Sequence, residues 1–221
     1  MNTILAMDTT GDTFTVAVWR EHCLAEVRGL RPRTHLRQLV PSLMHACAVA
    51  GLTLKDVTRL AVTVGPGSFT GVRLGILTAR TLGQTLDLPI VPVKTLEALA
   101  LNGRAGGLVL AANDARKEEI YSAVYRLEEG PVELVGAAAR RLPEVLELIR
   151  AHPGVAVVGN AWQRYHRELG QATGGPVAPR RDWSVRGEAV AWLGQRDDDR
   201  AVSWLELAPD YLRAPDVQVA R

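Results

Sequence analysis

The chain is poor in cysteine and aromatic residues, and it has no long apolar run. Of its 221 residues, two are cysteines and 5% are aromatic. Cys23 and Cys47 cannot form a disulfide framework, and their spacing is not that of a zinc site. The longest uncharged candidate, residues 60–72, contains three glycines and a proline, whereas a membrane helix needs roughly 18 apolar residues. These shortages exclude a disulfide-stapled scaffold and predict no membrane-spanning segment.

The charge of the chain is nearly balanced. Lys and Arg total 26 against 24 Asp and Glu, a formal net charge of +2 that excludes nucleic-acid binding by bulk charge but not through a local basic patch. Hydrophobic residues make up 47% and charged residues 23%, as in a globular protein of one large or two small domains. The N-terminus lacks the pattern of a signal peptide. Together with the few cysteines, this predicts a cytoplasmic protein.

A weak internal repeat divides the sequence into two halves. Residues 3–8 form an apolar run that ends at Asp8, and residues 14–19 form a second run beyond a turn, which predicts a β-hairpin. The same pattern returns 106 residues later, where Asp114 takes the place of Asp8. An apolar strand running into a glycine turn also occurs twice, at 61–65 and at 155–159.

Each half is therefore predicted to contain a hairpin, a helix, a buried strand, a glycine turn and another helix. Two such halves imply a duplicated α/β fold with a cleft between them. The alternative is that two unrelated α/β stretches share ordinary strand composition. The glycine-rich stretch 102–107 is the best boundary, and it predicts subdomains at 1–104 and 105–221.

Apolar periodicity, caps and prolines place the helices. Pro41 should kink the first helix or mark where its regular part begins. Residues 173–179 are expected to be a loop, and the acidic run 197–199 a surface turn. The predicted helices cover residues 34–51, about 70–88, 95–101, 143–150, 161–169 and 184–195.

The segment Gly65-Pro-Gly-Ser-Phe-Thr-Gly71 follows a strand and opens a helix. It is not a dinucleotide fingerprint, because the third glycine comes one residue late and Pro66 removes an N–H donor. It also lacks the Gly-Lys-Ser/Thr ending of a P-loop. As a sign of phosphate binding, the segment is weak.

Small residues recur every fourth position through this segment and the helix that follows. A glycine inside a helix costs about 1 kcal/mol relative to alanine, so a close-packed neighbour must compensate. The neighbour is either the protein's own sheet or a helix of a partner, and both interpretations remain open. The stripe consists of Gly67, Gly71, Gly75, Ala79 and Gly83.

Catalytic patterns are sparse. The five histidines form no i, i+4 metal pair, no nucleophile elbow is present, and no cysteine has a histidine at the spacing of a catalytic motif. Asp8, with Thr10 and Gly11, is a candidate for holding Mg²⁺ and nucleotide phosphates, but the favoured interpretation of Asp8 is an Asx-turn cap. Asp114 and Arg116 are candidates for a buried or interface ion pair. No metal ligand is predicted.

Several motifs together resemble the TsaB (YeaZ) family. Ile4-Leu-Ala-Met-Asp-Thr-Thr10 is similar to the first loop of the actin, sugar-kinase and Hsp70-type ATPase (ASKHA) fold. The family resemblance adds Arg33-Thr-His35 before Pro41, the glycine segment up to Arg73, Asp114-Ala-Arg116, and Pro209-Asp-Tyr-Leu-Arg213. It covers nearly the whole chain and implies the duplicated ASKHA fold.

The resemblance implies a role as the non-catalytic partner of TsaD. With the ATPase TsaE, these proteins attach threonylcarbamoyl, supplied as an adenylate by a separate synthase, to the adenosine beside the anticodon in tRNAs reading codons that begin with A. The helices at 34–50 and 71–85 would form a bundle with matching helices of TsaD. The implied partner-binding residues are Leu36, Leu39, Val40, Leu43, Gly71, Arg73, Leu74, Gly75, Leu77 and Thr78.

The resemblance also bears on catalysis and cofactors. Thr95 and Leu99 stand where catalytic relatives carry two metal-binding histidines, and neither is a good metal ligand. No cofactor is expected on the chain alone, with ATP or ADP and Mg²⁺ left open at the interface of the assembled complex. A homodimer through the TsaD surface, and contact with tRNA through the complex, are further expectations. The alternatives are a stand-alone kinase or ATPase of the same superfamily and a metallopeptidase-like protein.

Overall fold

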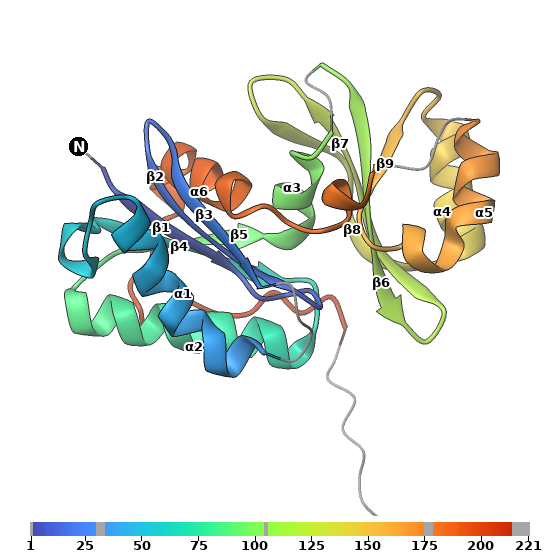
Figure 1. The fold of residues 1–221 in the computed structure, drawn as a ribbon. Helices are drawn as coiled ribbons and strands as arrows, with labels where there is room; N and C mark the ends of the chain where they lie inside the picture. Colours follow the sequence, from blue (N-terminus) through green and yellow to red (C-terminus); the bar gives the residue numbers. More distant parts are fainter. Residues whose placement is uncertain (1, 30–33, 104–105, 175–178, 214–221) are drawn as a thin grey trace, which may run out of the picture.

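Two β-sheets, each covered by helices, organise the chain into two lobes (Figure 1). The computed structural model describes residues 2–29, 34–103, 106–174 and 179–213. Among these residues, no helix is both long and apolar enough to cross a membrane.

The first sheet, sheet A, has five strands in the order β3-β2-β1-β4-β5. β1 pairs antiparallel with β2 and parallel with β4, so the chain crosses over before β4. Every residue of β1 and of β4 is buried, as expected for strands covered on both faces. The strands are β1 (Ile4–Asp8), β2 (Phe14–Arg20), β3 (His22–Gly29), β4 (Arg59–Gly65) and β5 (Ile90–Lys94).

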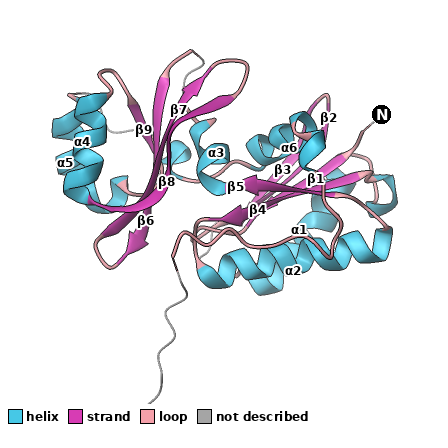
Figure 2. Cartoon of the chain, turned by 180° about the vertical axis from the view of Figure 1, so that it is seen from behind, coloured by secondary structure: helices cyan, strands magenta, loops and turns pink. Residues whose placement is uncertain are grey.

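Helices cover both faces of sheet A. α1 (His35–Val49) and α2 (Phe69–Leu86) lie side by side on one face, and α6 (Gly187–Arg196) lies on the other (Figure 2). The alternation of side chains along β1 divides the core accordingly. Leu5 and Met7 belong to the cluster under α1 and α2, whereas Ile4 and Ala6 belong to the cluster under α6.

The second sheet, sheet B, repeats this arrangement with four strands in the order β8-β7-β6-β9. β6 pairs antiparallel with β7 and parallel with β9, as β1 does with β2 and β4. The matching order confirms the predicted duplication. The elements of this lobe are β6 (Leu108–Arg116), β7 (Glu119–Leu127), β8 (Pro131–Arg141), α4 (Leu142–Ala151), β9 (Ala156–Val158) and α5 (Trp162–Thr173).

The two predicted glycine turns occupy equivalent places. Gly65 follows β4 with a φ of 123°, and Gly159 follows β9 with a φ of 114°. A Cβ at either position would meet a backbone carbonyl, that of Asp210 or that of Ala112. Only glycine satisfies both the positive φ and the lack of space.

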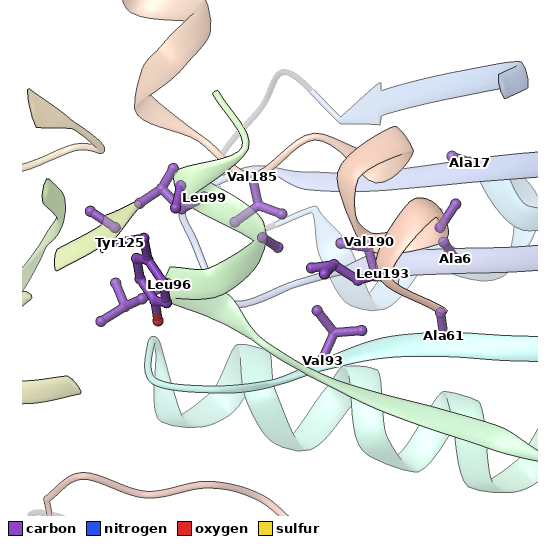
Figure 3. Close-up of a cluster of buried hydrophobic side chains, with 14 of the residues drawn as sticks. Ala6, Ala17, Ala61, Val93, Leu96, Leu99, Tyr125, Val185, Val190 and Leu193 are labelled. Carbon is purple, nitrogen blue, oxygen red and sulfur yellow. The ribbon is translucent and has the colours of Figure 1, made fainter. Parts of the chain in front are cut away.

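A shared core joins the lobes (Figure 3). Val93 at the end of β5, together with Leu96 and Leu99 of α3 (Thr95–Ala100), packs in one cluster with Tyr125 of β7 and with α6. Short 3-10 helices complete the chain at η1 (Leu54–Asp56), η2 (Arg180–Trp183) and η3 (Asp198–Arg200).

The structure corrects several sequence-based expectations. Each predicted hairpin is in fact a three-stranded meander, because β3 and β8 follow where no strand was predicted. The sequence signal was weak because both are edge strands with many half-buried or exposed residues. α1 is one helix despite Pro41, while α5 runs four residues past its predicted end at 169, to Thr173.

The C-terminal part of the chain also returns to the first lobe. The predicted boundary near residue 104 separates sheet A from sheet B, although residues 104–105 themselves lie outside the described residues. α6, assigned by sequence order to the second subdomain, instead packs on β1, β2 and β4. Of the predicted 173–179 loop, residues 175–178 also lie outside the description.

The end of α2 yields a stability prediction. Asp87 caps the helix in the left-handed conformation, at a φ of 53°, and its side chain is exposed. Glycine is preferred at such a cap, and a carboxylate is unfavourable at the negative end of the helix dipole. We expect Asp87→Gly to raise the free energy of unfolding by about 0.5–1 kcal/mol in urea titrations. Asp87→Asn, which removes only the charge, should give a smaller gain; a lower stability for the glycine variant would contradict this account.

Candidate partner-binding face

The outer sides of α1 and α2 expose large apolar side chains. Leu36, Val40 and Met44 recur every fourth residue along α1 and are 80%, 48% and 57% exposed. Leu77 on the neighbouring α2 is 64% exposed. The two helices contact each other on the same side of sheet A, so these exposed residues lie on neighbouring helices. We call Leu36, Val40, Met44 and Leu77 the helical face.

The apolar residues predicted on α1 divide between two sides of the helix. Leu39 and Leu43 are buried in the core of sheet A, together with Ala46 and Cys47. They are not available to a partner, which corrects the sequence-based assignment. Met44 was missed, although its spacing of four from Val40 is the signal that would have found it. Because α1 is apolar both toward sheet A and on an exposed side, its exposed side is suited to contact another protein surface.

The glycine stripe of α2 packs on the protein's own sheet. A Cβ on Gly71 would overlap the carbonyl oxygen of Thr9, and one on Gly75 would lie 2.5 Å from Thr9 Oγ1. The Thr9 hydroxyl donates a hydrogen bond of 2.7 Å to the carbonyl of Gly71. Gly71 and Gly75 are therefore corrected from partner-binding residues to packing residues, and the own-sheet interpretation holds for this stripe.

The remaining predicted residues of α2 lie beside the helical face. Leu74 and Thr78 are half-buried, and Arg73 is exposed. The Arg73 guanidinium lies 3.7 Å from the centre of the Phe69 ring, and its Nε donates to the Tyr211 hydroxyl at 3.2 Å. Arg73 thus fastens the C-terminal segment to the start of α2.

This C-terminal segment runs along α2 as a strap. Arg80 donates to the carbonyls of Leu205 and Leu207, and the Asp210 N–H donates to the Val64 carbonyl at 2.8 Å. Arg213 then forms an ion pair of 2.7 Å with Glu119, at the start of β7 in the other lobe. The strap covers the edge of α2 away from α1 and limits the helical face on that side.

Asp8 is the centre of a turn. Its Oδ1 accepts hydrogen bonds from the N–H and hydroxyl of Thr10, at 3.2 and 2.7 Å, and from the hydroxyl of Thr63 at 2.7 Å. The side chain is 3% exposed, and burial raises its pKa, against the lowering effect of these hydrogen bonds. The Asx-turn interpretation is confirmed. Oδ1 of Asp8 is thus engaged within the first lobe by three donors.

A cleft of 710 Å³ separates the lobes beside this turn. Asp8 and Gly11 line it from the first lobe, while Asn113 and Asn160 line it from the second. The two asparagines are already engaged, since Asn113 Oδ1 accepts the N–H of Asn160 and Asn160 Oδ1 accepts the N–H of Asp114. Of the candidates, Asp8 and Gly11 thus shape one wall of the cleft together with the exposed Asp12, whereas Thr10 does not line it.

The other candidate chemical groups are dispersed or structural. Asp114 Oδ1 accepts the backbone N–H of Arg116, so the expected ion pair is a turn hydrogen bond instead. Thr95 and Leu99 are fully buried in α3. Within the described residues, no group of three or more His, Cys, Asp or Glu side chains could hold a metal ion.

The duplicated strand order, with a helix-covered sheet in each lobe and a cleft between them, defines an ASKHA-like fold. A crystal structure from Pseudomonas aeruginosa, described as an uncharacterized protein with similarity to peptidase YEAZ, superimposes with a TM-score of 0.78 at 27% identity. The match covers 96% of this chain and 100% of that chain.

Comparison of sequences identifies the family within this class. A family model described as "TsaD: tRNA N6-adenosine threonylcarbamoyltransferase" matches residues 19–214. The "tRNA threonylcarbamoyladenosine biosynthesis protein TsaB" of Bacillus subtilis (strain 168) is 32% identical, over 98% of this chain and 96% of that protein. Its namesake in Escherichia coli (strain K12) is 36% identical over 77% and 76% of the two chains. The chain belongs to the TsaB (YeaZ) family.

The packing of α2 can be tested on the free protein. Gly71→Ala should lower the free energy of unfolding by about 1–3 kcal/mol, because the Thr9 backbone must move. Gly170→Ala in α5 is the matched control, since a Cβ there meets nothing within 4 Å. Alanine is the better helix former, so the control should be neutral or stabilising in thermal unfolding. Equal melting temperatures for Gly71→Ala and the wild type would refute the close contact.

The role of Asp8 has a distinct pH signature. Because its folded-state pKa is raised above 3.8, its stabilising contribution is complete below that pH and is lost as the pH rises through the folded pKa. Asp8→Asn keeps the Oδ1 acceptor without the buried charge. Its stability relative to the wild type should therefore increase as the pH rises from about 4 toward neutrality. Asp8→Ala should instead be less stable at every pH by about 1–3 kcal/mol, because three donors lose their acceptor. A flat difference between Asp8→Asn and the wild type would contradict the raised pKa.

Proposed function

We propose that the protein is an accessory scaffold subunit of tRNA threonylcarbamoyladenosine biosynthesis, and that it acts with TsaD and TsaE without catalysing a step itself. The names of its TsaB relatives support the pathway. The helical face is the observation that carries the scaffold role. An apolar surface shared by two neighbouring helices is typical of a helix-packing interface.

The chemistry of that face fits a helical partner. Leu36, Val40 and Met44 form a ridge at a spacing of four residues, which can pack into the groove between two ridges of another helix. Leu77 extends the surface onto α2. Related proteins present similar helices, so TsaD, whose family model matches this chain, is the proposed partner. The same face can pair two copies of this chain when TsaD is absent.

The rest of the proposal follows from that assembly. In this proposal, TsaE and tRNA bind to the complex of this protein with TsaD, and the complex acts in the cytoplasm. ATP or ADP with Mg²⁺ belongs, in this proposal, at the interface of the assembled complex. The buried Asp8 and the absence of a metal-holding side-chain group among the described residues give no support to a stand-alone kinase or a metallopeptidase.

Two charge insertions on the helical face provide the test. Val40→Glu and Leu77→Glu should leave the melting temperature of the free chain nearly unchanged, because both side chains are already exposed. Binding to TsaD, measured by calorimetry, should weaken at least about tenfold, equivalent to about 1.4 kcal/mol, because a carboxylate would be buried in an apolar contact. Threonylcarbamoylation of tRNA by the reconstituted complex should fall in parallel.

Val132→Glu on β8 is the matched control. Val132 is 42% exposed, close to the 48% of Val40, but it lies on the edge strand of sheet B. It should bind TsaD and support tRNA modification as the wild type does. Full TsaD binding by both helical-face variants would place the interface elsewhere. ATP hydrolysis by the isolated chain that disappears in Asp8→Ala would favour the kinase-like alternative.

A further inference from the structure

The cleft between the lobes has two walls of different chemistry. The first lobe contributes Asp8, at the end of β1, and the exposed Asp12 from the turn that follows. The second lobe contributes Asn113 of β6 and Asn160, which follows β9. The volume of 710 Å³ is that of a small-molecule site, since such sites measure roughly 300–1,000 Å³.

Asp8 brings a carboxylate oxygen without a donor to this cleft. All three of its hydrogen bonds end on Oδ1, so Oδ2 has no donor within the described part of the chain. The residue is 3% exposed, and a buried carboxylate oxygen that lacks a donor is costly. Because Asp8 lines the cleft, a molecule bound there can supply the missing donor.

The two asparagines offer the opposite groups. Asn113 Oδ1 accepts the N–H of Asn160, and Asn160 Oδ1 accepts the N–H of Asp114. These contacts fix the orientation of both side-chain amides, because only the oxygen can accept. The Nδ2 group of each amide therefore remains as a donor, and no acceptor in the described chain uses it. The second-lobe wall thus presents donors where the first-lobe wall presents acceptors.

The charges of the cleft follow the same division. Asp8 and Asp12 belong to the first lobe. Arg180 lines the cleft from η2, and its neighbour Trp183 packs against the core of the second lobe. The Arg180 guanidinium lies 5.7 Å from the centre of the Trp183 ring. Negative charge on one wall and positive charge on the other favour a ligand that carries both signs.

We propose that this cleft binds a free zwitterionic small molecule, with one primary ammonium group and one carboxylate. The ammonium lies at the Asp8 wall, where it supplies the donor that Oδ2 lacks. The carboxylate lies at the asparagine wall and accepts from the Nδ2 groups and Arg180. A simple cation or a simple anion would satisfy only one wall. Within the described chain, no residue of the helical face lines the cleft, so this binding is independent of the scaffold role.

Calorimetry of the full chain provides the test, with three probes that differ in the distance between their charged groups: glycine, 4-aminobutyrate and 6-aminohexanoate. We expect saturable binding of at least one probe, because its length must match the separation of the walls. The primary amine and the carboxylic acid of matching chain length each carry only one of the two groups. Each should bind at least about tenfold more weakly than the best probe.

Two variants exchange donor and acceptor atoms at the walls with almost no change in shape. Asp8→Asn and Asn160→Asp each keep the oxygen that is used inside the protein, for the threonine donors and for the Asp114 N–H. Each should weaken binding of the best probe at least about tenfold, because donor would meet donor or carboxylate would meet carboxylate. Asp87→Asn and Asn2→Asp make the same exchanges at exposed positions outside the cleft, so these matched controls should bind as the wild type does.

The outcomes are distinguishable. Asp8→Asn should melt no lower than the wild type at neutral pH, so its weaker binding cannot result from unfolding. Val40→Glu, on the helical face, should bind the probe normally, which separates this proposal from the scaffold role. The proposal is overturned if no probe saturates, if the single-charge analogues bind as tightly as the zwitterion, or if both wall variants bind normally. Binding of Mg²⁺–ADP without any zwitterion would likewise overturn it and assign the cleft to a nucleotide.

Discussion

The close contact between α2 and the turn after β1 determines how the first lobe is built. Gly71 and Gly75 bring the α2 backbone against Thr9, and the Thr9 hydroxyl binds the Gly71 carbonyl. A helix with side chains at these positions would stand further from the sheet. α2, held close to the sheet, contacts α1. Leu77 of α2 and the exposed ridge of α1 therefore lie on neighbouring helices.

In the first lobe, the turn and cleft differ from the outer helices in which side chains are free. The hydroxyls of Thr10 and Thr63 donate hydrogen bonds to Asp8 Oδ1. The glycine segment that follows β4 allows α2 to pack closely on the turn after β1. In the cleft, Asn113 Oδ1 accepts the N–H of Asn160, and of the two aspartates Asp8 is buried and Asp12 is exposed. The outer helices, by contrast, expose apolar side chains without a partner in the described chain. The accessible apolar surface of the first lobe thus lies outside the cleft, on α1 and α2.

The C-terminal segment links this face to the rest of the molecule. α6 completes the back of sheet A, and the strap then passes along α2 to Glu119 of the second lobe. Arg73, Arg80 and Arg213 hold the strap, each through a charged group on a hydrogen-bond acceptor. Charge-assisted hydrogen bonds of this kind are stronger than neutral ones, so they can position a segment that has no regular secondary structure.

The sequence by itself determined the elements whose signal is local. The hairpins, the glycine turns at Gly65 and Gly159 and the extent of α2 depend on neighbouring residues, and the duplication depends on their recurrence. It could not show whether Gly75 faces a sheet or a partner, because a stripe of small residues fits both. It also missed β3, β8 and the return of α6 to sheet A. Edge strands are only half-buried, and long-range packing leaves no periodic pattern. Which side of α1 is free was likewise decided only when the tertiary structure buried Leu39 and Leu43 and left Leu36, Val40 and Met44 in solvent.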